Sequence, residues 1–137
     1  MKNVKTIRFK VNDDKWGRLV PIEGNDTVPF DIKRVYYIYD VNEEKRRGFH
    51  SHKKLEQVLI CVHGSIKILV KTPKEEKVFV LDNPNKGLYI GNNVWREMFD
   101  WENEAVLLVL ASEHYDESDY IRNYDDYEKY YNSGVKK

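Results

Sequence analysis

The sequence predicts an all-β fold, a sandwich or barrel, followed by one short helix. Up to about residue 112, segments rich in β-branched and aromatic residues alternate with clusters of Gly, Pro, Asn and Asp, the pattern of strands joined by turns. Many short strands at this spacing are typical of sandwiches and barrels, jelly rolls among them. A chain of 137 residues has the length of one domain. We therefore expect a β-barrel domain over residues 1–112 and a helical extension of the same domain over residues 113–137.

Ten strands are expected before the helical extension, and three turns between them are marked by their residue types. These turns are expected at residues 63–65, 72–75 and 82–85, where Gly, Pro, Asn and Asp occur. The first of them would close a tight hairpin. The expected strands span residues 4–10, 17–22, 32–40, 47–52, 56–63, 65–71, 76–81, 86–91, 94–99 and 104–111.

The helical extension is predicted from a stripe of aromatic residues. An amphipathic helix brings residues three and four apart onto one face, and a cap is expected among residues 116–119. We expect this face to pack on the sheet or on a partner subunit rather than to bind a cofactor. The stripe consists of Tyr120, Ile121, Tyr124, Tyr127 and Tyr131.

Composition and charge exclude several classes of protein. The chain carries 23 Lys plus Arg against 23 Asp plus Glu, which argues against global attraction to nucleic acid or to a membrane surface. Its apolar runs are shorter than the roughly 20 residues of a membrane span, and the start MKNVKTIRFK lacks the apolar core of a signal peptide. The lone Cys61 is expected to be a buried small hydrophobe, and a reducing cytoplasm is the expected location.

The chemistry is expected at a pair of histidines on one strand. His50 and His52 are separated by one residue, so their side chains lie on the same face of a strand. Paired imidazoles inside a barrel indicate a metal site, an acid–base site or a polar plug. His63, at the expected hairpin, and His114, before the helix, are expected at the surface.

Basic residues gather around this pair although the whole chain is neutral. Alternation along a strand places Arg34, Tyr36 and Ile38 on one face, so that face offers both a cation and a phenol. Guanidinium and ammonium groups beside the histidines would suit a diphosphate. The basic residues of this region are Lys33, Arg34, Lys45, Arg46, Arg47, Lys53 and Lys54.

The histidine segment resembles the first motif of the cupin superfamily, a family of small jelly-roll barrels. The match consists of His50, His52, Gln57 and Gly64, and residues 90–97 resemble the second motif. In metal-binding cupins a glutamate stands at the position of Gln57 and a histidine at that of Arg96. A neutral amide is a weak ligand and a guanidinium is none. We therefore expect no metal and no other cofactor, which disfavours a metal-dependent dioxygenase.

Longer segments resemble one cupin group, the sugar-nucleotide 3,4-ketoisomerases. These segments are residues 32–38, 47–57, 87–91, 94–98 and 110–122. The resemblance implies a metal-free homodimer that moves the keto group of dTDP-4-keto-6-deoxyglucose from C4 to C3, in the biosynthesis of dTDP-linked amino sugars. The jelly roll that the resemblance implies agrees with the strands expected from the residue pattern.

The resemblance also implies roles for individual residues. It assigns His50 as the base, with His52 orienting the substrate or relaying a proton, and Tyr36 with Arg34 as donors to the developing oxyanion. Other residues are expected to bind the substrate. They are Arg47, Lys54 and Arg96 toward diphosphate or sugar, Gln57 as a hydrogen-bonding residue, Trp16, and Trp95, which either walls the cavity or simply packs.

Two residues bear on the stereochemistry of the product. Family members with a galacto-configured product tend to have arginine at the position of Trp16 and histidine at that of Arg96. This chain resembles the members with a gluco-configured product, and a guanidinium is a poor acid. The expected product is therefore dTDP-3-keto-6-deoxy-D-glucose.

Two other functions fit the same residues. One is a dTDP-sugar 3,5-epimerase-like cupin, which also pairs histidine with tyrosine but has a longer chain and a different histidine context. The other is a non-catalytic cupin that binds a sugar nucleotide. The intact pair of His50 and His52 argues weakly against simple binding.

Overall fold

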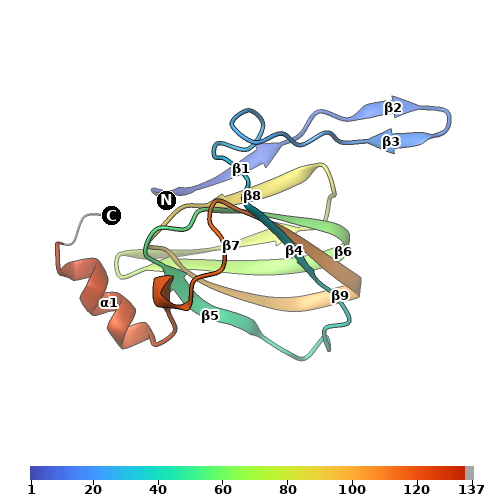
Figure 1. Ribbon diagram of the computed structural model, residues 1–137. Helices are drawn as coiled ribbons and strands as arrows, with labels where there is room; N and C mark the ends of the chain where they lie inside the picture. The colour runs from blue at the N-terminus through green and yellow to red at the C-terminus, as the bar shows by residue number, and fades with distance from the viewer. Residues whose placement is uncertain (135–137) are drawn as a thin grey trace.

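The computed structural model describes residues 1–134, which form a two-layered antiparallel β-sandwich with one helix beside it (Figure 1). Short strands at this spacing were predicted, and the all-β class is confirmed. A 3-10 turn at Glu117–Asp119 precedes the last strand. The strands are β1 (Val4–Arg8), β2 (Asn12–Asp14), β3 (Gly17–Leu19), β4 (Arg34–Ile38), β5 (Arg47–His52), β6 (Gln57–Thr72), β7 (Glu75–Leu81), β8 (Lys86–Ile90), β9 (Trp95–Ala111) and β10 (Tyr120–Ile121), and the helix is α1 (Tyr124–Asn132).

Two long strands, β6 and β9, bend and take part in both layers. Their outer halves, residues 57–61 and 107–111, pair with each other, with β8 and β1 on one side and β4 on the other. Residues 67–71 of β6 and 95–99 of β9 pair in the second layer, which β7 and β5 extend. β4 and β5 therefore lie in different layers and face each other across the interior (Figure 1).

The predicted hairpin at residues 63–65 is wrong, because β6 continues through it. Gly64 has a φ of 76° and lies where the pairing between β6 and β9 shifts register. The backbone of β9 approaches so closely that a Cβ on Gly64 would lie 2.4 Å from the carbonyl oxygen of Glu102. The glycine therefore serves a bulge that bends a long strand between layers. The expected strands over 94–99 and 104–111 are likewise one strand, β9.

The other two predicted turns are confirmed, but the ends of the chain differ from the prediction. Turns at residues 73–74 and 82–85 separate β6, β7 and β8. The segment expected as a strand over 17–22 forms only one arm of a hairpin, β2–β3, that projects from the sandwich (Figure 1). The helix starts at Tyr124 with Asn123 as its cap, whereas Tyr120 and Ile121 pair with β5 as β10.

The main core lies between the two layers, where side chains of β6, β8 and β9 interdigitate. A second cluster beneath residues 20–32 covers the outer face of the first layer. Tyr127, fully buried, anchors α1 against Trp95 and Ile121. Cys61 is buried as predicted, and burial raises the pKa of its thiol to about 11. Within residues 1–134, no helix is long and apolar enough to cross a membrane.

Candidate active site

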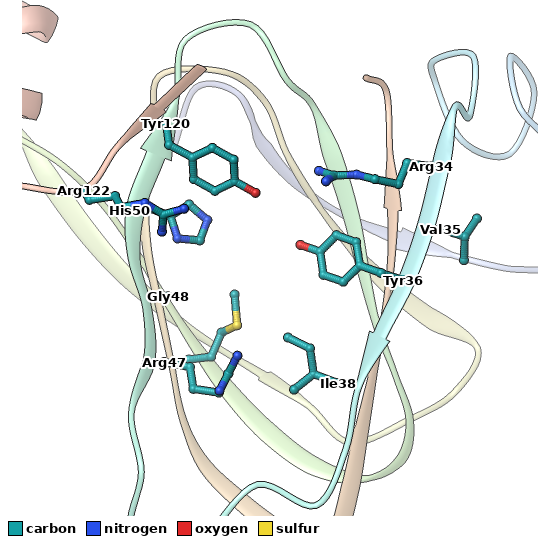
Figure 2. A pocket seen from close by; sticks show the side chains of 10 residues that line it. Arg34, Val35, Tyr36, Ile38, Arg47, Gly48, His50, Tyr120 and Arg122 are labelled. Atoms are coloured by element: carbon teal, nitrogen blue, oxygen red, sulfur yellow. The ribbon is translucent and has the colours of Figure 1, made fainter. Parts of the chain in front are cut away.

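A cavity of about 380 Å³ opens into the interior between β4 and β5. Figure 2 shows that β4 presents Arg34 and Tyr36 from one side, while His50 and Tyr120 face them from β5 and β10. The predicted alternation of β4 is confirmed, because Arg34, Tyr36 and Ile38 are partly buried and the residues between them are exposed. The cavity is lined by Arg34, Val35, Tyr36, Ile38, Arg47, Gly48, His50, Met98, Tyr120 and Arg122.

A bulge in β5 aims the two histidines. Gly48 and Phe49 have φ values of 94° and 58°, and the pairing of β5 with β9 shifts between Gly48 and His50. Beyond the bulge, His50 and His52 point to the same side, with ring centroids 4.9 Å apart and the rings nearly perpendicular. Tyr120 packs against both rings at 5.1 and 4.3 Å. Only His50 of the two histidines lines the cavity.

Asp119 holds the ring of His52. Its Oδ2 lies 3.2 Å from Nδ1 of His52, and the carboxylate also accepts backbone N–H bonds from Lys54 and Leu55. Burial alone would raise the pKa of Asp119, but the bonds from His52 and the two amides outweigh it and lower that pKa. An ionised carboxylate only accepts, so Nδ1 carries the proton and Nε2 of the neutral ring is left as an acceptor.

Both histidines are neutral at physiological pH. Burial, together with the positive charge of Arg96, lowers the pKa of His50 to about 3. Burial also lowers the pKa of His52 to about 4, against the opposing effect of Asp119. A neutral imidazole has a free lone pair and is ready to accept a proton.

Behind the cavity, Arg96 and Gln57 form a buried hydrogen-bonded chain that ends at Tyr36. Arg96 donates from Nη1 to Oε1 of Gln57 over 2.6 Å and from Nη2 to the carbonyl of Val94 over 3.1 Å. Nε2 of Gln57 lies 3.0 Å from the hydroxyl of Tyr36. Arg96 and Gln57 are 0% and 1% exposed, so neither is placed to meet a solvated diphosphate.

Three arginines give the cavity its positive charge. Arg34 stacks on Tyr36 with its guanidinium 5.2 Å from the ring, and its Nε and Nη2 are buried without a hydrogen-bond partner in residues 1–134. Arg47 lines the rim. Arg122 lies 4.3 Å from the Tyr120 ring centroid and pairs with Glu117. Such a set of cations suits an anionic ligand such as a diphosphate.

Besides Arg96 and Gln57, which lie behind the cavity, three predicted substrate residues do not line it. Trp16 lies on the projecting hairpin, 84% exposed, and contacts a shallow pocket formed by its own hairpin. Trp95 packs against Tyr124 and Tyr127 of α1. Lys54 lines a separate surface pocket beside Asp119. His63 and His114 are exposed, as predicted.

Four residues of the site were not predicted as site residues from the sequence. Tyr120 was assigned to a helix, and nothing in the periodicity showed that it pairs with His52 across a two-residue strand. Arg122 and Asp119 lie beside it in the segment 110–122, whose family resemblance was the one signal that marked them. Met98 lines the cavity because the register of β9 against β5 pairs it with Arg47.

The residues do not fit a metal ion, which many cupins bind at this position. Among residues 1–134 no group of three or more His, Cys, Asp or Glu side chains is placed to hold one. The positive charge of Arg96 acts on both imidazoles, and a buried cation disfavours a second one. What the arrangement offers instead is a neutral base facing a phenol and a guanidinium across one cavity, a set suited to proton transfer next to a carbonyl.

Comparisons with known proteins agree with this chemistry. The family model FdtA (WxcM-like, C-terminal) matches residues 2–132. A TDP-4-oxo-6-deoxy-alpha-D-glucose-3,4-oxoisomerase of Aneurinibacillus thermoaerophilus is 52% identical over 126 residues, covering 92% of this chain and 91% of the relative.

Two solved structures are also closely similar. One is a histidine-to-asparagine mutant of the 3,4-ketoisomerase QdtA of Thermoanaerobacterium thermosaccharolyticum in complex with TDP-4-keto-6-deoxyglucose. It is 57% identical, with a TM-score of 0.95 over 100% of this chain and 99% of that one. The other is the TDP-quinovose 3,4-ketoisomerase WlaRB of Campylobacter jejuni, 47% identical, with a TM-score of 0.91 over 94% and 99% of the two chains.

Proposed function

We propose that this chain, which belongs to the FdtA family, is a TDP-sugar 3,4-ketoisomerase acting on TDP-4-keto-6-deoxyglucose. The observation that carries the proposal is the cavity itself, in which a neutral His50 faces Tyr36 and Arg34. The close relatives named for this reaction support the substrate class.

The reaction needs a base, an oxyanion donor and a proton source at one place. The base removes the proton from C3, the C–H electron pair forms the C3–C4 double bond, and the C4 carbonyl π pair moves to O4. O4 then takes up a proton as O3 loses one, the O3–H electron pair forms the C3 carbonyl, and the electron pair of the C3–C4 double bond takes up a proton at C4. Two protons leave, from C3 and O3, and two are gained, at C4 and O4, so the atoms balance. We assign proton removal to His50 because its ring lines the cavity, whereas His52 lies behind it.

The low proton affinity of His50 in the free protein is compatible with this role. Negative charge that develops on the enediolate beside the ring favours the imidazolium and raises its pKa in the complex. Tyr36 and Arg34 are assigned as donors to O4, where the charge appears. His52, held by Asp119, is assigned to orient the sugar or relay a proton, and Arg47 and Arg122 to bind the diphosphate.

Incubation with TDP-4-keto-6-deoxyglucose in heavy water, followed by NMR, tests the reaction. We expect a 3-keto product with deuterium at C4 and recovered substrate with deuterium at C3. Deuterium at both C3 and C5 would favour a 3,5-epimerase instead. Binding of the nucleotide sugar without turnover, left intact in His50→Asn, would favour a binding protein.

We further propose that the product has the gluco configuration, TDP-3-keto-6-deoxy-D-glucose. Trp16 and Arg96 support this, since the family resemblance links an aromatic and an arginine at these positions with that product. The similarity to a TDP-quinovose 3,4-ketoisomerase also supports it, because quinovose is 6-deoxyglucose. For product made in ordinary water, so that C4 carries a proton rather than deuterium, a large coupling between H4 and H5 is expected in the NMR spectrum, and a small one would indicate the galacto product.

We propose that the protein is a homodimer in the cytoplasm. Its exposed apolar surface supports a second copy. Trp16 and Leu19 on the projecting hairpin, Val35 and Tyr37 on β4, and Tyr39 just past it are 56–84% exposed. A projecting hairpin is suited to reach a partner, which would place Trp16 at the partner's cavity. The single cysteine and the sugar-nucleotide substrate class support a cytoplasmic location.

A further inference from the structure

The buried chain Arg96–Gln57–Tyr36 joins three strands and ends at the cavity. Arg96 lies on β9, Gln57 at the start of β6 and Tyr36 on β4. The bond between Arg96 and Gln57 is short, 2.6 Å, and the bond between Gln57 and Tyr36 has an ordinary length of 3.0 Å. At 0% and 1% exposure, Arg96 and Gln57 exchange no hydrogen bonds with bulk water, so the chain is fixed by its own members.

The chemistry of these groups gives the chain one direction. A guanidinium only donates, so the amide oxygen of Gln57 must face Arg96. The amide nitrogen then faces Tyr36 and donates to its hydroxyl oxygen. A hydroxyl that accepts on this side must place its single proton elsewhere. Figure 2 shows the hydroxyl of Tyr36 directed into the cavity toward His50 and Tyr120.

We infer that Arg96 and Gln57 are positioning residues that commit the hydroxyl of Tyr36 to donating into the cavity, at the place of the substrate's C4 oxygen. The inference rests on the proposed ketoisomerase function. As His50 takes the C3 proton and the carbonyl π pair moves to O4, the Tyr36 hydroxyl donates a hydrogen bond to the new oxyanion and keeps its proton. A donor already oriented costs no reorganisation as the charge develops.

The same chain tunes Tyr36 as a donor. Burial raises the pKa of the Tyr36 phenol, and the hydrogen bond from Gln57 together with the charges of Arg96 and Arg34 opposes this rise. The positions of Gln57 and Arg96 are those at which the resembling metal-binding cupins have ligands. In this chain the two residues instead orient a phenol.

The decisive variant is Gln57→Glu, which keeps the shape of the side chain and reverses the bond. A glutamate would accept from Arg96 with one oxygen and from Tyr36 with the other, so the phenol proton would turn out of the cavity. We expect kcat to fall about 100-fold, the scale of losing one oxyanion donor, with KM within a few-fold. Tyr36→Phe should lower kcat by a similar factor, while the control Tyr130→Phe on α1 should keep the wild-type kcat.

A double-mutant cycle separates positioning from a structural role. If Gln57 acts through Tyr36, the double variant Gln57→Glu/Tyr36→Phe is no slower than Tyr36→Phe alone. The inference is overturned if the two losses in kcat multiply in the double variant. It is also overturned if the kcat of Gln57→Glu lies within threefold of the wild-type value. Thermal unfolding of each variant checks that the fold is retained.

A second measurement does not depend on turnover. With tyrosines labelled at ¹³Cζ, NMR titration should show a higher pKa for Tyr36 in Gln57→Glu than in the wild type, because the phenol then donates to a carboxylate. An unchanged Tyr36 titration would overturn the inference. If the wild-type protein fails to convert TDP-4-keto-6-deoxyglucose, the proposed function is overturned. The titration then still tests whether Gln57 sets the hydrogen bond of Tyr36.

Discussion

His50 and His52 owe their charge state to burial rather than to their residue type. An exposed histidine titrates near pH 6.5, but burial and the nearby Arg96 lower the pKa values of these rings to about 3 and about 4. The sequence placed the two imidazoles on the same face of one strand, which leaves their pKa values undetermined. The structure makes them neutral bases over the whole physiological range.

This charge state predicts an unusual pH–rate profile. The profile of kcat/KM reports ionisations of the free enzyme, so it should stay flat from about pH 8 down to about pH 5.5. The profile of kcat reports the enzyme–substrate complex, in which the anionic substrate raises the pKa of His50, so its acid inflection should lie at a higher pH than that of kcat/KM. Initial rates across a buffer series give both profiles. A halving of kcat/KM near pH 6.5 would show that the free histidines titrate normally.

The same lowered pKa values predict a loss of stability in mild acid. The unfolded chain binds protons at both histidines below about pH 6.5, while the folded chain binds them only near its values of about 3 and about 4. Stability is therefore present above pH 6.5 and is lost as the pH falls toward 4, by about 2 kcal/mol per histidine between pH 7 and 5.

Urea unfolding across this pH range measures the effect. His52→Gln should remove about half of the pH dependence, whereas His114→Gln, an exposed histidine outside the site, should leave it unchanged. Equal pH dependence in the two variants and the wild type would contradict the assignment to buried histidines.

At the scale of elements, bulges carry the strands from one layer to the other and aim the site. β6 bends at Gly64 and β5 at Gly48, where φ is positive and the backbone of β9 passes within contact distance. Sequence reasoning read the glycine of residues 63–65 as a hairpin turn, because a local pattern does not distinguish a turn from a bend within one strand. The distinction depends on whether β9 lies alongside, which is a long-range contact.

Gly64→Ala should destabilise the protein far more than Gly134→Ala. Both glycines have a φ near 77°, but a Cβ at Gly64 would meet the carbonyl oxygen of Glu102 at 2.4 Å, and at Gly134 it would meet nothing within 4 Å. Both sites share the strain of a positive φ, so the difference between the two losses of unfolding free energy measures the clash alone. We expect this difference to exceed about 2 kcal/mol. Chemical unfolding of the two variants provides the comparison, and similar losses would contradict the close approach.

At the scale of the whole molecule, the charges are balanced in number and separated in space. The formal net charge is zero, yet Arg34, Arg47 and Arg122 all line one cavity. Residues 33–54 were expected to supply this positive charge. The structure adds Arg122, which the chain brings back to β5 through β10.

The proposed dimer predicts that two inactive variants complement each other. If Trp16 serves the partner's cavity, a heterodimer of His50→Asn and Trp16→Ala chains has one site with both residues intact. Co-expression with different tags, followed by tandem purification, isolates that heterodimer. It should regain about half of the wild-type kcat/KM, one whole site of two. Light scattering that shows a monomer, or a heterodimer no more active than either parent, would contradict the arrangement.

The sequence by itself determined the all-β class, most strand positions, the facing histidines and the alternation of β4, because these follow from local periodicity and residue type. It also identified the family, through motifs that lie close together in the chain. Only the tertiary structure decided that Arg96 and Gln57 lie behind Tyr36 as a buried chain, that Asp119 and Tyr120 return to the histidines, and that Trp16 points away. These features depend on strand register and on contacts between distant segments, and the depressed histidine pKa values depend on burial, none of which a local pattern specifies.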